Sequence, residues 1–202
     1  LSGSTYSLAD YNRAGVPLIE IVTTPCMHNG KEAMLYLEKL RETLLYLGVS
    51  DVKIEEGSMR CDVNVSLSNN ETLGTKCEVK NIGSISNVGI AVDYEIKRQE
   101  EILNRGIKLE EETRRFDDKT KTTVLMRVKE TGNDYRYFPE PDLPLVYITD
   151  EWIEEITNSM PILTDELKNK YELLGLNSNN IKTIISNKDI CNFLESILDK
   201  CN

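Results

Sequence analysis

Apolar and polar residues alternate along several short stretches of the chain, which is the pattern typical of strands with one buried face. In the clearest stretch, Met59, Cys61, Val63, Val65 and Leu67 fall on one face and the residues between them are polar. Such patterns, together with a β-rich run at Pro17, predict strands near residues 17–23, 59–67, 75–82, 112–116 and 122–129. The second and third strands, and likewise the fourth and fifth, are joined by short loops, so each of these pairs is expected to form an antiparallel hairpin.

Two longer stretches repeat their apolar residues every three or four positions, as helices packed by one face do. The first predicts a helix near residues 30–47, with Asn29 as N-cap, Glu32 completing a capping box and Gly48 at its end. The second predicts a helix near residues 84–105, ended by Gly106.

These elements predict an α+β fold, a mainly antiparallel sheet with both long helices packed on one face. After residue 150 the pattern changes to short amphipathic helices, whose candidate N-caps are Asp150, Thr164 and Ser178. We therefore place a domain boundary there. Residues 1–150 are expected to form part of one domain, and residues 151–202 the start of a helical domain.

The composition is that of a soluble globular protein, with 202 residues of which 40% are hydrophobic and 29% are charged. No apolar run approaches the roughly 20 residues that a membrane-spanning helix needs. We therefore expect a cytoplasmic protein with no membrane partner. The chain has no initiator Met and stops directly after a helical pattern, which leads us to expect a fragment at both ends.

The cysteines and the single histidine argue against a zinc site. None of the five cysteines forms a CxxC pair, and His28 is the only histidine. Cys61 and Cys77 lie in strand-like runs and are interpreted as reduced thiols of the core. A single histidine also leaves almost no candidate for a Ser-His-Asp triad, so amide hydrolysis within this chain is not expected.

The net charge of -10 bears on possible partners. An extended nucleic-acid surface would be basic, so any RNA contact must be local or lie on a partner. An acidic excess fits either carboxylates gathered around a divalent cation or plain solubility, and the charge alone does not decide between them.

Glu20 and the pair Glu55 and Glu56 are candidate metal ligands. Glu20 lies among apolar residues of the first expected strand, where an ionised carboxylate is costly unless it is paired or binds a cation. The alternative is an edge strand with Glu20 in solvent. Glu55 and Glu56 precede Gly57 in an expected turn, where their oxygens suit Mg²⁺ but are also compatible with simple solvation.

Two groups of charged residues lie on the expected hairpins. The polar face of the first gathers Arg60, Asp62, Asn64, Lys76, Glu78 and Lys80. The second carries the basic cluster Arg114, Arg115, Arg127 and Lys129. Basic residues beside Mg-binding acids suit a phosphoryl-transfer cleft, whereas cross-strand ion pairs on a solvated face are the alternative. Because the chain has no Gly-rich P-loop, ATP would have to be held by a sheet-based cleft.

A set of motifs, in order along nearly the whole chain, resembles the B-subunit family of the aspartyl/glutamyl-tRNA amidotransferases. The motifs are residues 11–22 (YNRAGVPLIEIV), 36–41 (YLEKLR), 46–51 (YLGVSD), 55–64 (EEGSMRCDVN), 74–81 (GTKCEVKN), 112–117 (ETRRFD) and 134–143 (DYRYFPEPDL). Ordered matches of this kind are highly specific.

The resemblance implies a cradle-like catalytic domain with a fold similar to that of glutamine synthetase, then a helical domain and an RNA-binding tail. It implies use of ATP and Mg²⁺ to phosphorylate the side-chain carboxylate of mischarged Glu-tRNA(Gln) or Asp-tRNA(Asn). Ammonia released from glutamine by the family's A subunit would then displace the phosphate, while the small C subunit clamps the other two together. The family's N-terminal strands with further metal ligands, the zinc site of many members and most of the tail are absent from this sequence. Alone, the chain is therefore expected to hold part of the site and to be inactive.

The geometry of the expected strands, taken with the resemblance, suggests roles for residues. Glu20 and Glu78 are expected on neighbouring strands, sharing a Mg²⁺, with Glu55 and Glu56 as second choices. The residues expected to act on the reacting groups are Arg60, Asp62 and Lys80, and those expected to hold ATP are Arg60, Asn64, Lys80, Arg114, Arg115 and Arg127. Two alternatives are a noncatalytic tRNA-binding scaffold of the same fold and a ligase acting on free glutamate. The intact acids and bases and the motif set favour the tRNA enzyme.

Overall fold

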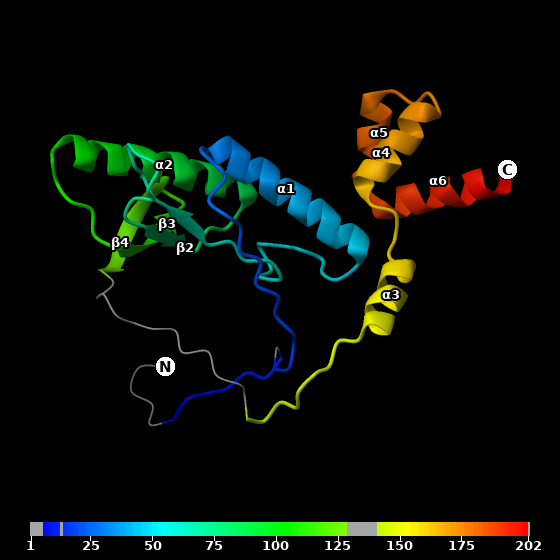
Figure 1. Ribbon diagram of the computed structural model, residues 1–202, viewed down its shortest axis with the longest axis horizontal. Coiled ribbons are helices and arrows are strands. Elements are labelled where there is room, and N and C mark those ends of the chain that lie inside the picture. The colour runs from blue at the N-terminus through cyan, green and yellow to red at the C-terminus, as the bar shows by residue number, and fades with distance from the viewer. Residues whose placement is uncertain (1–5, 13, 129–140, 202) are drawn as a thin grey trace.

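The computed structural model describes residues 6–12, 14–128 and 141–201. As expected, the fold is α+β, with a four-stranded sheet (Figure 1). The strands are β1 (Val63–Val65), β2 (Cys77–Lys80), β3 (Glu112–Asp117) and β4 (Thr122–Val128). The helices are α1 (Gly30–Leu47), α2 (Ile85–Asn104), α3 (Asp150–Ser159), α4 (Thr164–Leu173), α5 (Ser178–Ile185) and α6 (Lys188–Cys201).

The sheet is mixed. β1 with β2 and β3 with β4 form the two expected antiparallel hairpins, whereas β2 and β3, at the centre of the sheet, run parallel. α2 connects these two central strands, and a helical crossover returns the chain so that the next strand runs in the same direction. The expectation of a mainly antiparallel sheet did not take account of this connection.

Residues 17–22 do not form the expected strand. They have no regular secondary structure, and their side chains are exposed, Leu18 to 90%. A strand needs a neighbour for its backbone N–H and C=O groups, and none of the strands in the described ranges pairs with this segment. β1 is also shorter than expected, because residue 59 lies in a bend and residues 60–62, 66 and 67 have no regular secondary structure.

The ends of α1 follow the predicted capping signals. Asn29 Oδ1 accepts a hydrogen bond of 2.9 Å from the backbone N–H of Glu32. The Glu32 carboxylate in turn accepts one of 2.7 Å from the backbone N–H of His28. Gly48 closes the helix in the left-handed conformation, with φ 72°.

Three helices of the C-terminal part are capped one residue earlier than predicted. The N-caps of α3, α4 and α5 are Thr149, Leu163 and Asn177, so the predicted caps are instead the first helical residues. Thr149 and Asn177 each accept a hydrogen bond from the backbone N–H three residues later, which explains why these helices begin where they do.

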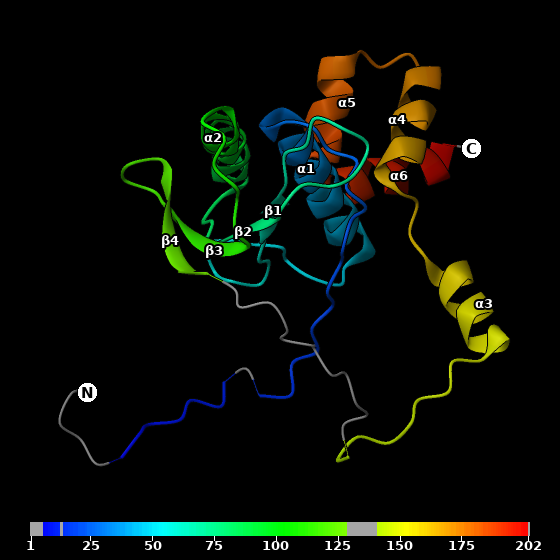
Figure 2. The same cartoon turned by 60° about the vertical axis from the view of Figure 1, so that its left-hand side comes forward.

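α1 and α2 lie together on one face of the sheet, as predicted (Figure 2). The two helices approach closely at Gly30 and Gly89, where a Cβ on Gly30 would lie 2.2 Å from the carbonyl oxygen of Gly89. The backbone N–H of Gly30 also donates a hydrogen bond of 2.8 Å to Asp93 Oδ1 on α2. The core beneath them contains Ala33, Leu37, Val65, Cys77, Val79, Ile82, Val88, Ala91, Val92 and Phe116.

A second core joins α4, α5 and α6 to the C-terminal half of α1. The hydroxyl of Tyr46, on α1, donates a hydrogen bond of 2.8 Å to the carbonyl oxygen of Ile185. Lys188 Nζ, on α6, donates one of 2.8 Å to the carbonyl oxygen of Tyr46 and so caps the end of α1. Thus α1 contributes side chains to both cores. The domain boundary near residue 150 stays a prediction.

None of the helices in the described part is long and apolar enough to cross a membrane.

Candidate functional site

Polar residues of both hairpins line up across the face of the sheet that α1 and α2 leave uncovered. In one row, backbone pairing places Asn64 opposite Glu78, Glu78 beside Thr113, and Thr113 opposite Arg127. The residues that alternate with Glu78 on β2 are buried under the helices, so Glu78 points to the other side. This side is termed the outer face, and its polar residues are Asp62, Asn64, Glu78, Lys80, Thr113, Arg115 and Arg127.

Lys80 joins two carboxylates at the centre of the outer face. Its Nζ lies 3.0 Å from Asp62 Oδ2 and 3.0 Å from Glu78 Oε1. The hydrogen bonds to Asp62 and Glu78 raise the pKa of Lys80 above its ordinary value, against the opposing effect of burial. Lys80 is therefore a cation at neutral pH, suited to binding an anion and not to accepting a proton.

Two arginines extend the positive charge along the same face. Arg115 is the register partner of Lys80, and Arg127 lies opposite Thr113. Both side chains are exposed. The outer face therefore places Lys80, Arg115 and Arg127 on the same side of the sheet as the acids Asp62 and Glu78. This combination suits a phosphorylated ligand that carries a divalent cation.

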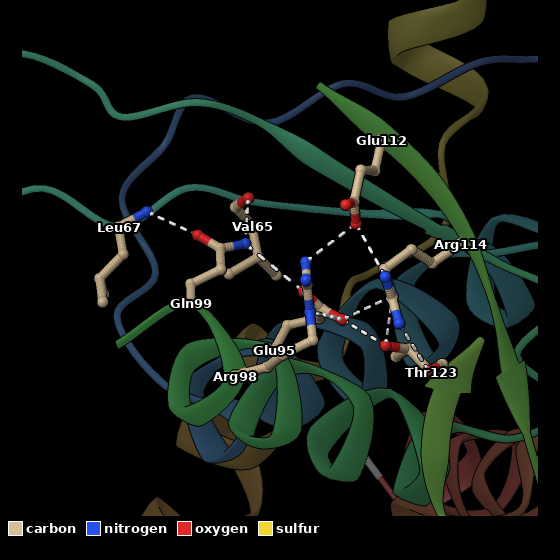
Figure 3. A network of polar contacts seen from close by, with 8 residues as sticks. All are labelled: Val65, Leu67, Glu95, Arg98, Gln99, Glu112, Arg114 and Thr123. Atoms are coloured by element: carbon tan, nitrogen blue, oxygen red, sulfur yellow. Dashed lines mark hydrogen bonds and ion pairs between the residues drawn. The ribbon is translucent and has the colours of Figure 1, made fainter. Parts of the chain in front are cut away.

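Arg114, which was also predicted to hold ATP, does not lie on this face. Its side chain is 12% exposed, and its guanidinium turns toward α2 (Figure 3). Nη1 lies 2.8 Å from Glu112 Oε2, and Nε donates a hydrogen bond of 2.8 Å to Thr123 Oγ1. Its N–H donors bind groups on the helix side of the sheet. Arg114 and Arg115 are adjacent on the strand, so their side chains point to opposite faces.

Arg114 is part of a buried ion network that fixes α2 to β3 and β4. Glu95, which is fully buried, accepts hydrogen bonds from Arg98 Nε at 3.1 and 3.0 Å, and from the hydroxyl of Thr123. Arg98 also reaches Glu112 Oε2 at 3.2 Å. Two carboxylates and two guanidiniums thus neutralise one another between α2 and the sheet (Figure 3).

Gln99, one helical turn after Glu95, extends the network to β1. Its amide donates a hydrogen bond of 3.1 Å to the carbonyl oxygen of Val65 and accepts one of 3.0 Å from the backbone N–H of Leu67 (Figure 3). Neither Glu95 nor Gln99 was among the candidate residues predicted from the sequence. The signal was present, because Glu95 and Gln99 continue the helical stripe of Val88 and Val92 with polar residues.

The structure does not bring the other candidate metal ligands to Glu78. Glu20 is exposed and lies in the segment that forms no strand, so the expectation that it sits on a strand beside Glu78 is wrong. Glu55 and Glu56 are exposed in a turn, where Glu56 pairs with Lys53 at 2.8 Å. Glu55 lines a separate pocket, whose other residues are Glu38, Arg41, Val52, Ile54, Ser84, Ile85 and Ser86.

Arg60 is exposed and precedes β1, outside regular secondary structure. Lys129 and most of the 134–143 motif lie outside the described residues, as does Arg13 of the first motif.

The outer face fits part of a Mg²⁺ site and not a complete one. Asp62 and Glu78 supply the hard oxygen ligands that Mg²⁺ prefers, and both lie within reach of the same Lys80 ammonium. Across the ranges that the structure describes, no three side chains of His, Cys, Asp or Glu gather to hold a metal. Proteins commonly bind Mg²⁺ through one or two carboxylates, with phosphate oxygens and water completing the shell, and the pair fits that arrangement.

Comparisons with known proteins agree with the motif resemblance. The family described as "GatB/GatE catalytic domain" matches residues 1–154. Proteins named as the B subunit of aspartyl/glutamyl-tRNA(Asn/Gln) amidotransferase are similar over most of this chain. That of Geobacillus thermodenitrificans is 50% identical over 198 residues, and that of Bacillus licheniformis is 48% identical over 202 residues. That of Staphylococcus aureus is 51% identical over 197 residues. These matches cover 96%, 98% and 96% of this chain, which spans 42% of the length of each relative.

Proposed function

The chain belongs to the GatB/GatE catalytic-domain family, and from this we propose that it forms part of the ATP-dependent active site of a tRNA-dependent amidotransferase. The reaction proposed is activation of the side-chain carboxylate of Glu-tRNA(Gln) or Asp-tRNA(Asn), followed by amidation. The relatives carry that substrate pair in their names. The observation that carries the proposal in this structure is the group formed by Asp62, Glu78 and Lys80 on the outer face.

The chemistry needs a leaving group on a poor electrophile. A carboxylate oxygen would attack the γ-phosphorus of ATP with release of ADP, and ammonia would then displace phosphate from the acyl phosphate, losing a proton to give the amide. Attack by an anion on an anion requires positive charge around the phosphates. Lys80, Arg115 and Arg127 would supply it, and Asn64 offers a neutral hydrogen-bonding group in the same row.

Asp62 and Glu78 would hold Mg²⁺, which when bound neutralises phosphate charge. Glu20 and the turn acids Glu55 and Glu56 stay proposed ligands of lower rank, since the described structure does not place them beside Glu78. Arg60 stays a proposed contact of the reacting groups. Arg114 is left out because its guanidinium is bound within the core.

The proposed partners follow from the same chemistry. The single histidine, His28, leaves almost no candidate for a Ser-His-Asp triad, so ammonia is proposed to come from a separate glutaminase, the A subunit. The small C subunit would hold the glutaminase and this chain together. The compartment proposed is the cytoplasm, where tRNA is used.

Glu78→Gln tests the proposal in the full-length complex. The substitution keeps the shape of the side chain but removes its charge, so amidated tRNA should fall to the background level while glutamine hydrolysis persists. Both products, amidated tRNA and free glutamate, are measured with wild type and with Glu110→Gln, an exposed acid in the loop before β3 that should behave as wild type. Undiminished amidation by Glu78→Gln would show that the outer face is not the active site.

A further inference from the structure

Thr113 is a buried hydroxyl residue on the outer face and has no assigned role. It is the second residue of β3, one of the two inner strands of the sheet, and it is 2% exposed. Thr113 Oγ1 donates a hydrogen bond of 3.2 Å to Glu78 Oε2. The other carboxylate oxygen, Oε1, lies 3.0 Å from Lys80 Nζ. Thr113 therefore contacts one carboxylate oxygen of Glu78 and Lys80 contacts the other. Together these two contacts fix the orientation of the carboxylate plane.

The position of Thr113 is itself fixed from the opposite side of the sheet. Its neighbours Glu112 and Arg114 both point toward α2, where they join the buried network with Glu95 and Arg98. The register of β3 against β4 shifts between Thr113 and Arg114, so the strand is irregular at this point. The ion pairs made by the flanking residues, Glu112 and Arg114, fix the position of the Thr113 backbone despite this irregularity. The hydroxyl is thus presented to Glu78 by a rigid support.

A threonine could occupy this site for its β propensity alone. Valine has the same shape and an equal or greater preference for strands, so it would then serve as well. The hydrogen bond to Glu78 is what valine cannot make. A hydrogen bond to a charged group is among the stronger polar contacts, and it is directional, so its loss frees the carboxylate to rotate.

We propose that Thr113 is a positioning residue that orients the Glu78 carboxylate for a divalent cation. The proposal rests on the proposed function, in which Glu78 is a metal ligand. Thr113 itself touches neither metal nor substrate. Its hydrogen bond fixes Oε2 of Glu78. With Oε2 fixed, Oε1 of Glu78, which lies on the side of Lys80 and Asp62, is oriented to bind the cation. Preorganisation of this kind raises metal affinity because less freedom is lost on binding.

The test compares Thr113→Val with Thr113→Ser in the full-length protein within its complex. Binding of Mn²⁺ alone is measured by electron paramagnetic resonance, and amidation is measured as a function of Mg²⁺ concentration. Thr113→Val should weaken Mn²⁺ binding and raise the Mg²⁺ requirement by about tenfold, the order expected for one hydrogen bond to a charged group. Thr113→Ser, which keeps the hydroxyl, should return both to within about threefold of wild type. Thermal unfolding of each variant shows that the fold is retained.

Wild-type Mn²⁺ affinity in Thr113→Val would overturn the inference, and so would equal losses in the valine and serine variants, because packing would then be the cause. Glu78→Gln, assayed in parallel, separates this failure from failure of the proposed function. If Glu78→Gln loses Mn²⁺ binding and amidation while Thr113→Val keeps both, the inference alone is wrong. If Glu78→Gln keeps both, the proposed site is wrong and the inference falls with it.

Discussion

Replacing Glu95 by Gln tests whether the buried ion network holds α2 to the sheet. Glu95 is fully buried and interacts with the guanidiniums of Arg98 and Arg114, the nearest contacts being 2.9 and 3.4 Å. Gln keeps the size of the side chain but leaves two cations to share the carboxylate of Glu112. Removing one partner from a buried ion pair costs about 3–5 kcal/mol. That is a large part of the roughly 5–15 kcal/mol by which a domain is stable.

The measurement is urea unfolding followed by far-UV circular dichroism. Fluorescence would be a poor probe, because the only tryptophan, Trp152, lies on α3, which has no buried residue. Glu101→Gln, an exposed acid on the same helix, is the matched control and should change the free energy of unfolding by less than about 0.5 kcal/mol. A loss in Glu95→Gln no larger than in this control would refute the reasoning.

The effect should also depend on pH in a defined direction. Burial alone would raise the pKa of Glu95, but hydrogen bonds from Arg98 and Thr123 and the charges of Arg98 and Arg114 outweigh it and hold that pKa below its ordinary value. A carboxyl with a lowered folded-state pKa stabilises the fold above its unfolded-state pKa of about 4.3, and loses this contribution as pH falls through the folded-state pKa. The difference between wild type and Glu95→Gln should therefore be full at neutral pH and shrink in acid.

Two further predictions concern packing and thiols. Gly30→Ala should lower the free energy of unfolding by about 1–3 kcal/mol, because its Cβ would meet the backbone of α2. Gly83→Ala, with open space around it, should leave that free energy unchanged, and urea unfolding measures both. Burial, with the added effect of nearby acids, raises the pKa of Cys61 to about 11 and of Cys77 to about 12, so at pH 8 iodoacetamide should label exposed Cys26 first. Mass spectrometry of the labelled peptides checks the order, and equal labelling of all three in the folded protein would contradict it.

Local signals in the sequence predicted the helices and hairpins well. Asn29, Glu32 and Gly48 each act within one or two helical turns, so their effect is readable without knowing the rest of the fold. Residues 17–22 show the limit of such reading. Their composition favours a strand, but strand formation depends on a partner that composition does not identify. The parallel pairing of β2 and β3 likewise depends on the path of α2 through space.

The part of the candidate site that could be predicted is the part in which strand alternation alone determines the face on which a side chain lies. Asp62, Glu78 and Lys80 share a face because the pleat has a period of two, and the structure brings them into contact. Arg114 and Arg115 show why a cluster in sequence is not a cluster in space. Adjacent strand residues point to opposite sides, so one arginine joined the core and the other the outer face. Thr113 was missed because nothing in its sequence context marks a threonine as a hydrogen-bond donor to an acid on the neighbouring strand.

Because α1 contributes to both cores, it connects them mechanically. At about 1.5 Å per residue, a helix of this length, 18 residues, is a stiff rod of roughly 27 Å. Its C-terminal end is held by Lys188 of α6, and its N-terminal end by Asp93 of α2. The α4–α6 bundle and α2 are therefore attached to opposite ends of one stiff element, so the helix itself and not a loop sets the distance between these two attachment points.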